Sequence, residues 1–117
     1  MKILYLEDNR HEAALVSRFM QTTPHDLVVA STLDEARQAA AASPELVMVD
    51  LVLGPTRDGF RFIRELRAQG YEQAIIAVTG LSAPSDLQEC RRVGANDVLV
   101  KPFTINQLAA VIHQYAS

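Results

Sequence analysis

Residues 45–50 read ELVMVD, a short apolar run that ends in an aspartate. Similar runs begin at Ile3, Asp26, Ala74 and Val98. They are rich in Val, Ile and Leu and do not alternate strictly with polar residues, which is typical of strands covered on both faces, as in a parallel sheet. We therefore expect five strands, at Ile3 to Leu6, Asp26 to Ala30, Glu45 to Val49, Ala74 to Val78 and Val98 to Val100.

A stretch of helical period follows each predicted strand. Four helix starts have capping-box spacing, and Asp58 is a single N-cap candidate for the third helix. The capping-box pairs are Asn9 with Glu12, Thr32 with Glu35, Ser85 with Gln88 and Thr104 with Gln107. Five alternating units of strand and helix predict an α/β fold of the (βα)5 type, a doubly wound five-stranded parallel sheet with helices on both faces.

Length and composition set the outer limits. The chain has 117 residues, 49% of them hydrophobic, which predicts a single domain over residues 1–117. The formal net charge of -3 argues against a nucleic-acid binder. Cys90 is the single cysteine, so an internal disulfide is excluded. No apolar run approaches the length of a membrane span, and the amino end does not look like a signal peptide. We expect a cytoplasmic protein that does not bind membranes.

Polar residues follow four of the five predicted strands. Glu7 and Asp8 follow the first strand, Asp50 the third, Thr79 the fourth and Lys101 the fifth. Parallel strands carry such residues to one edge of the sheet, where doubly wound folds bind ligands. Three carboxylates that lie close together repel one another and attract a cation, and a set of oxygen ligands suits Mg²⁺ or Mn²⁺ better than zinc.

These residue types together suit phosphoryl transfer. A carboxylate at a strand end, Asp50, can attack phosphorus in line, while a metal ion and Lys101 neutralise the charge on the phosphoryl oxygens. Thr79 can donate its hydroxyl to the same group. The expected product is an acyl phosphate on Asp50.

The motifs at these strand ends resemble those of the receiver domain of two-component response regulators. The signs are Glu7-Asp8, Asp50, Thr79-Gly80 and Lys101-Pro102, in this order and spread over the whole chain. The resemblance implies a flavodoxin-like fold and a phosphoprotein that is not an enzyme. It further implies a sensor histidine kinase or histidine phosphotransfer protein as phosphodonor, and an output partner that the sequence does not identify.

The resemblance also assigns ligands and one backbone conformation. In that family Mg²⁺ is held by the acidic pair, here Glu7 and Asp8, by the phosphoacceptor, here Asp50, and by a backbone carbonyl two residues further on. That carbonyl belongs to Val52 in this chain. The family's Lys-Pro bond is typically cis, so we expect a cis bond between Lys101 and Pro102.

Three features depart from the family pattern. Glu7 stands where an aspartate is more frequent, and the loop at residues 51–57 is one residue longer than its commonest form. Val98 stands where many members carry a Tyr or Phe that swings inward on phosphorylation. A rotating aromatic switch is therefore excluded, and we expect the signal to pass through Thr79, residues 80–84 and the fourth helix.

Two other functions compete with the phosphorylated switch. A degenerate receiver would bind partners without phosphorylation, and the missing aromatic at Val98 is the sequence feature in its favour. A phosphatase of the haloacid-dehalogenase kind would need a second aspartate two residues after Asp50, where this chain has Val52. The sequence suits either a stand-alone receiver or a receiver from a longer protein such as a hybrid kinase.

Three further interpretations concern residues outside the strand ends. Val52 and Leu81 are apolar and cannot orient an attacking water, which predicts slow self-dephosphorylation. Cys90 is interpreted as a small buried apolar group, with a redox sensor as the alternative. The arginines of the third helix are interpreted as a solvated face with pairs such as Arg61 and Glu65, and docking of an acidic partner is the alternative. They are Arg57, Arg61, Arg64 and Arg67.

Overall fold

The computed structural model describes residues 1–116, and it contains the five strands and five helices that the sequence predicts. The strands are β1 (Lys2–Leu6), β2 (Asp26–Ala30), β3 (Leu46–Asp50), β4 (Ala74–Thr79) and β5 (Asp97–Val100). The helices are α1 (Arg10–Met20), α2 (Leu33–Ala40), α3 (Asp58–Ala68), α4 (Pro84–Val93) and α5 (Ile105–Tyr115). The strands form one parallel sheet in the order β2-β1-β3-β4-β5, as a doubly wound α/β fold requires.

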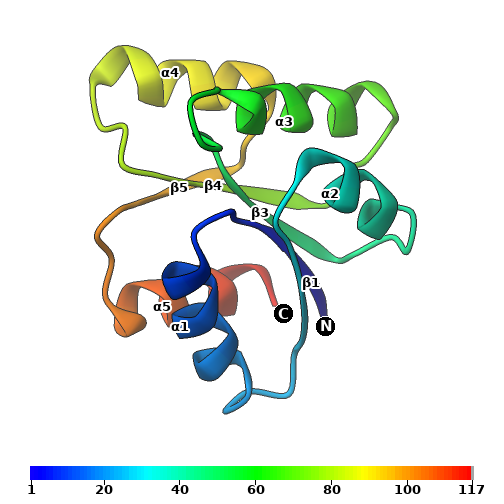
Figure 1. Cartoon of the computed structure of the whole chain (residues 1–117), viewed down its shortest axis with the longest axis vertical. Coiled ribbons are helices and arrows are strands. Elements are labelled where there is room, and N and C mark those ends of the chain that lie inside the picture. The colour runs from blue at the N-terminus through cyan, green and yellow to red at the C-terminus, as the bar shows by residue number, and fades with distance from the viewer. Residues whose placement is uncertain (117) are drawn as a thin grey trace.

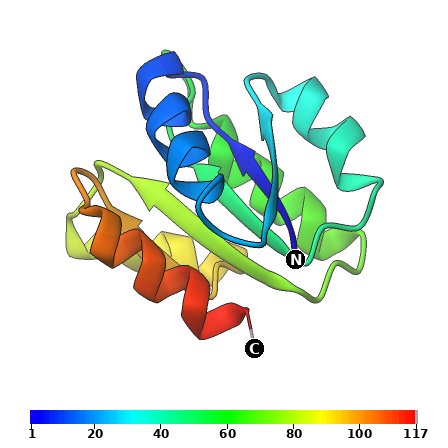
Figure 2. The same ribbon diagram turned by 90° about the horizontal axis from the view of Figure 1, so that it is seen from below.

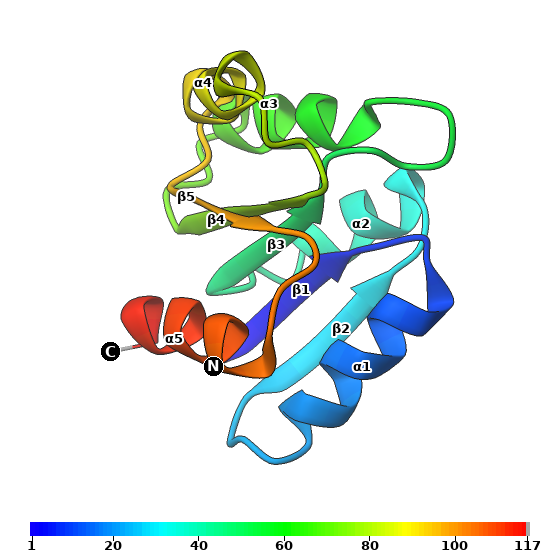
Figure 3. The same ribbon diagram turned by 90° about the vertical axis from the view of Figure 1, so that its left-hand side faces the viewer.

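Helices cover both faces of the sheet. In Figure 1, α2, α3 and α4 lie above the strands, and α1 and α5 lie below them. Figure 2 looks onto the face that α1 and α5 cover, and Figure 3 shows the same layers from the side. β3 is central and buried on both faces: Val47 and Val49 belong to the core under α2 to α4, whereas Leu46 and Met48 belong to the core under α1 and α5. This two-sided burial explains its continuous apolar sequence.

The helix starts follow the predicted capping pattern only in part. Thr104 and Gln107 form the complete capping box at the start of α5. Thr32 caps α2, but the carboxylate of Glu35 accepts from Ser31 instead of from Thr32. Likewise Asn9 Oδ1 accepts from the N–H groups of His11 and Glu12 at the start of α1, while the carboxylate of Glu12 accepts from Lys101, just after β5.

Two predicted caps are wrong. α4 begins at Pro84 with Ala83 as its N-cap, because proline is favoured in the first helical turn, and Ser85 lies inside the helix. Asp58 does not cap α3 either: the N-cap position is Arg57, which makes no side-chain cap bond, and Asp58 lies in the first turn. An acidic residue there still interacts favourably with the helix dipole.

One of the arginines on α3 has a structural role that the solvated-face interpretation missed. Arg61 does pair with Glu65, at 3.3 Å. Arg67, however, folds over the loops that precede β4 and β5, at the amino edge of the sheet. Its guanidinium donates to four oxygens, those of Tyr71 (2.6 Å), Gln73 (2.9 Å), Gly94 (3.0 Å) and the Asn96 side chain (2.7 Å). Backbone carbonyls and an amide thus replace solvent around this cation.

Cys90 is fully buried on α4, as expected for a small apolar group. Burial raises the pKa of its thiol, which disfavours the reactive thiolate that a redox sensor needs.

Within the described residues, no helix is long and apolar enough to cross a membrane.

Candidate functional site

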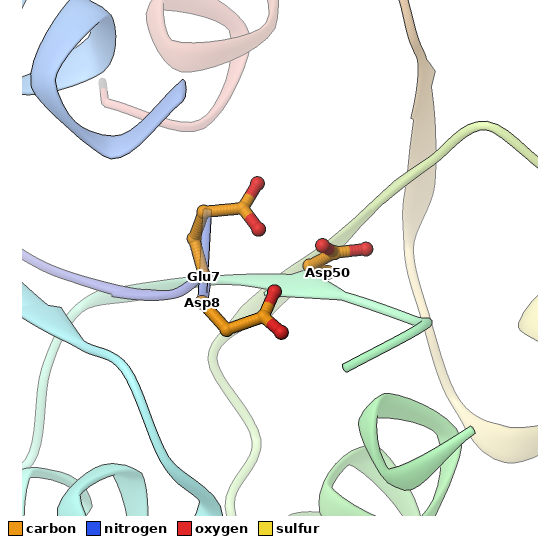
Figure 4. A group of neighbouring side chains, drawn as sticks. All are labelled: Glu7, Asp8 and Asp50. Atoms are coloured by element: carbon orange, nitrogen blue, oxygen red, sulfur yellow. The ribbon is translucent and has the colours of Figure 1, made fainter. Parts of the chain in front are cut away.

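Three carboxylates meet at the carboxyl edge of the sheet. Asp50 is the last residue of β3, and Glu7 and Asp8 follow the neighbouring strand β1. Figure 4 shows the Glu7 and Asp8 side chains extending toward the side on which Asp50 lies. One oxygen from each carboxylate lies within 4.8 Å of the other two. Glu7 is 1% exposed and Asp50 6%, whereas Asp8 lies at the surface.

Lys101 is the cation of this cluster. Its Nζ donates to Glu7 Oε1 at 2.8 Å, to Glu12 Oε2 at 2.8 Å and to Asp50 Oδ2 at 3.2 Å. The backbone N–H of Lys101 donates to the carbonyl of Thr79 at 2.7 Å, which fixes the residue just beyond the β4–β5 pair. The bond from Lys101 to the following proline is cis, as predicted.

Opposing effects act on the ammonium of Lys101. Burial lowers the pKa of Lys101, but the hydrogen bonds to Glu12 and Glu7 and the charge of Asp50 outweigh burial. The net pKa lies above the ordinary value for lysine, so the side chain stays charged at neutral pH.

Glu7 is the most enclosed of the three acids. Its Oε1 accepts from the hydroxyl of Tyr5 at 3.0 Å, and its Oε2 accepts from the backbone N–H of Asn9 at 3.3 Å. Burial raises the pKa of Glu7, as does its hydrogen bond with Asp50, whereas Lys101 acts in the opposite direction. Ionisation of Glu7 is therefore less favourable than that of a solvent-exposed glutamate, and further positive charge in the site would favour it.

Thr79 lies at the same edge. It is the last residue of β4 and is fully buried, and its Oγ1 accepts from the N–H of Leu81 at 2.9 Å. Val98, in β5, packs against the core under α2 to α4, so a small side chain occupies this position of the last strand.

The loop between β3 and α3 wraps around the acidic cluster. The N–H of Val52 donates to Asp50 Oδ1 at 3.2 Å, and the N–H of Gly54 donates to Asp8 Oδ2 at 2.8 Å. Leu53 and Thr56 exchange backbone hydrogen bonds across this turn, and Gly54 adopts a φ of 56°, in the left-handed region that glycine tolerates. The longer loop is thus a tight turn that contacts Asp8.

Gly59 allows the loop to return close to Asp50. Its N–H donates to the carbonyl of Leu51 at 3.2 Å. A Cβ at this position would lie 2.1 Å from the backbone oxygen of Asp50 and 2.4 Å from the Cα of Leu51. Any side chain here would displace the backbone that carries the Asp50 carboxylate.

The sequence interpretation missed three contributors to this site. It assigned Glu12 to a helix cap, although the side chain reaches Lys101. It treated Tyr5 as a strand residue, and gave Gly54 no role. The alternation of side chains along β1 was the available signal for Tyr5, since residues two apart on a strand share a face and Tyr5 is two before Glu7. Contacts made by Glu12 and Gly54 depend on the tertiary fold.

The donor set fits a small divalent cation. Carboxylate oxygens from Glu7, Asp8 and Asp50 converge without a sulfur or imidazole ligand among them, which is the ligand type that Mg²⁺ prefers. Lys101 supplies one positive charge against these acids and Glu12. The cluster thus keeps negative charge that a cation can neutralise.

Comparison with known proteins agrees with this geometry. The family model described as "Response regulator receiver domain" matches residues 3–113. The chain belongs to the response regulator receiver domain family. Proteins of this family are signalling domains of two-component systems, in which histidine kinases phosphorylate the response regulators.

Similar proteins combine such a domain with additional sequence. A probable C4-dicarboxylate response regulator DctR of Halalkalibacterium halodurans is 29% identical over 118 residues, which cover 98% of this chain and 51% of the relative. The transcription factor SKN7 of Saccharomyces cerevisiae is 32% identical over 97% of this chain and 18% of its own length. The chain thus spans about half the length, or less, of these curated relatives.

Solved receiver domains have the same fold. The BeF3-activated N-terminal receiver domain of Klebsiella pneumoniae RstA superimposes with a TM-score of 0.90 at 28% identity, over 98% of this chain and 97% of that one. The receiver domain of the sensor histidine kinase PA1611 of Pseudomonas aeruginosa, which has a magnesium ion in its active-site cleft, gives 0.85 at 26% identity, over 97% and 95% of the two chains.

Proposed function

We propose that the chain is a phosphorylation-controlled switch in which Asp50 is the phosphoacceptor. The observation that carries this proposal is the position of Asp50: its Oδ2 accepts from Lys101, and its carboxylate lies within reach of Glu7 and Asp8 at the carboxyl edge of the sheet. The phosphodonor is a phosphohistidine on a sensor histidine kinase or a histidine phosphotransfer protein. A downstream partner reads the altered surface.

The transfer forms an acyl phosphate. A carboxylate oxygen of Asp50 attacks phosphorus, the P–N bond of the phosphohistidine breaks, and the imidazole leaves with the electron pair and takes up a proton. Lys101 already donates to Asp50 Oδ2, so its ammonium lies where the charge on the phosphoryl oxygens develops.

Mg²⁺ fits the acidic cluster, and Mn²⁺ would fit the same ligands. We assign Glu7, Asp8, Asp50 and the backbone carbonyl of Val52 as the residues that would hold it. When bound, the ion would neutralise charge on the phosphoryl oxygens. The hydrogen bond from Gly54 to Asp8 fixes one of the proposed ligands against the loop.

Thr79 and the apolar residues near it govern the lifetime of the acyl phosphate. The hydroxyl of Thr79 accepts from Leu81, so its own proton is oriented by this bond and can be donated to a phosphoryl oxygen. Val52 and Leu81 carry no group that could orient an attacking water, which predicts a long-lived acyl phosphate.

The conformational signal passes through α4 in this proposal. Val98 cannot rotate as an aromatic residue would, so the response reaches the surface through Thr79 and residues 80–84. α4 buries Cys90 and Val93, whereas α3, which packs beside it, buries five residues. α4 is the first helix after Thr79 in the chain, and fewer buried side chains hold it than hold α3, so a change at Thr79 can move α4 more easily than α3.

The test is phosphate uptake from acetyl phosphate with Mg²⁺, followed by mass spectrometry of the intact protein. The wild type is expected to gain the mass of one phosphoryl group, and Asp50→Asn is expected to gain none. Asp26→Asn is the matched control, since Asp26 is exposed at the amino end of β2. A wild type that gains no phosphate under these conditions would overturn the proposal and favour a receiver that binds partners without phosphorylation.

A further inference from the structure

Lys101 has one carboxylate partner that lies outside the metal-binding cluster. An ammonium offers three N–H donors, and here they are directed to Glu7, Asp50 and Glu12. Glu7 and Asp50 come from strand ends and belong to the group that could hold a metal ion. Glu12 comes from the first turn of α1 and is not part of that group.

Glu12 is also the partner that faces solvent. Its side chain is 37% exposed, compared with 0% for Glu7 and 9% for Asp50. It lines a cavity of about 240 Å³ between α1 and the start of α5, next to the exposed side chains of Leu15 and Ile105. A phosphodonor that approaches from this side therefore meets the charge of Glu12 before it meets Lys101.

The ion pair places a negative charge close to the proposed phosphoryl group. When Asp50 is phosphorylated, the donor that Lys101 directs to Asp50 passes to a phosphoryl oxygen. Because both acceptors would then bond the same Nζ, the Glu12 carboxylate and the phosphoryl oxygens can be separated by no more than about two hydrogen-bond lengths. At that distance the two anions repel each other.

We propose that Glu12 is a positioning residue for Lys101. It holds the ammonium among carboxylates, and its charge repels anionic small-molecule phosphodonors. This inference rests on the proposed function of Asp50. A protein phosphodonor that presents a cationic side chain to Glu12 would relieve the repulsion, so Glu12 favours basic protein donors over free acyl phosphates.

Glu12→Gln separates charge from geometry, since the amide oxygen can still accept from Lys101. We expect the apparent KM for acetyl phosphate, at saturating Mg²⁺, to fall by about three- to tenfold, with a smaller change in the maximal rate. The gain should shrink as salt is raised. It should also be smaller with phosphoramidate, which carries less negative charge than acetyl phosphate at pH 7. Glu12→Ala, followed by circular dichroism to check folding, is the second variant.

Glu72→Gln is the matched control, because it makes the same change in net charge at an exposed residue in the loop before β4. It should leave the KM unchanged. The proposed role of Glu12 would be overturned if Glu12→Gln had an unchanged KM for acetyl phosphate or was phosphorylated more slowly. It would also be overturned if the fall in KM did not depend on salt and on donor charge. In either case phosphate uptake by the wild type and its loss in Asp50→Asn report separately on the proposed function.

Discussion

Lys101 and Arg67 are half-buried cations at opposite edges of the sheet, and they have different kinds of partners. At the carboxyl edge, Lys101 donates to three carboxylates. At the amino edge, Arg67 donates to three backbone carbonyls and the side-chain oxygen of Asn96. Carboxylates can exchange a lysine for a metal ion or a proton, whereas backbone carbonyls fixed in two loops cannot leave. The arrangement around Lys101 suits a site whose charge changes, and the arrangement around Arg67 suits a permanent structural contact between two loops.

The pKa shifts of the two cations point in opposite directions because their partners differ in charge. Burial lowers the pKa of Arg67, and neutral acceptors do not compensate. Burial also lowers the pKa of Lys101, but hydrogen bonds to Glu12 and Glu7 reverse the effect. At the amino edge, hydrogen-bond geometry alone thus holds the desolvated Arg67. At the carboxyl edge, electrostatic attraction to carboxylates holds Lys101.

The largest expected effect on stability is at the amino edge. Arg67→Leu leaves the carbonyls of Tyr71 and Gly94 without their donor, and we expect the free energy of unfolding to fall by about 3 kcal/mol. Urea unfolding followed by circular dichroism measures this change. Arg61→Leu is the control, since its exposed pair with Glu65 should contribute no more than about 0.5 kcal/mol. Equal losses of unfolding free energy in the two variants would show that Arg67 contributes no more to stability than a solvated arginine.

Lys101→Met should have a smaller effect that depends on the metal. In a chelating buffer at pH 7 we expect a loss of about 2 kcal/mol, because Glu7 and Asp50 lose their cation but Glu7 can take up a proton. Adding Mg²⁺ should stabilise this variant more than it stabilises the wild type, since the ion no longer competes with the ammonium. Unfolding curves with and without Mg²⁺ measure both effects.

Arg67→Leu should respond differently to Mg²⁺. Its deficit should persist when the metal is added, because the carbonyls at the amino edge lie outside the acidic cluster. If Mg²⁺ restored Arg67→Leu and left Lys101→Met unimproved, the proposed assignment of a charge-exchanging edge and a fixed edge would be wrong.

The sequence predicted the carboxyl edge better than the amino edge. The parallel orientation of the strands follows from the alternation of apolar runs with helical segments, and this orientation alone carries Asp50 and Lys101 to the same edge. The contacts of Arg67 could not be predicted in this way, because they join loops whose conformations depend on the packed helices. The sequence pattern of a helix face is the same whether an arginine on that face extends into solvent or donates to a backbone carbonyl.

The same limit explains Glu12 and the caps. Spacing of three residues predicts a capping box, but a long carboxylate takes whichever donor the tertiary fold brings near, and for Glu12 this is Lys101. The N-cap of α4 is Ala83, two residues before the predicted Ser85, since the intervening Pro84 fits the first turn of a helix.

The next effect concerns pH, and two glutamates should respond with opposite sign. Burial raises the pKa of Glu7, so its contribution to stability is complete below the ordinary pKa of glutamate and is lost as the pH rises through the folded-state value. In a chelating buffer, Glu7→Gln should therefore gain stability at pH 7 relative to the wild type, and this gain should vanish toward pH 4.

Glu65 supplies the comparison. The hydrogen bond from Arg37 lowers the pKa of Glu65, so its contribution is present above the ordinary pKa and is lost as the pH falls through the folded-state value. Glu65→Gln should lose stability at pH 7, and the loss should shrink in acid. Urea unfolding of both variants from pH 4 to pH 7 gives the dependence of each stability difference on pH. Slopes of the same sign would contradict the conclusion that burial raises the pKa of Glu7.

The smallest expected effect is at the ion pair that joins the carboxyl edge to α4. Arg57, just before α3, donates to Asp86 in the first turn of α4 at 2.9 Å, and the Arg57 side chain is 58% exposed. A double-mutant cycle of Arg57→Gln and Asp86→Asn should give a coupling energy of about 0.2 to 1 kcal/mol, as exposed pairs do. A coupling above about 2 kcal/mol would mean that α4 is fixed as firmly as the loops that Arg67 joins. In the proposed switch the signal passes from Thr79 through α4, and a weak pair between Arg57 and Asp86 is what that route requires.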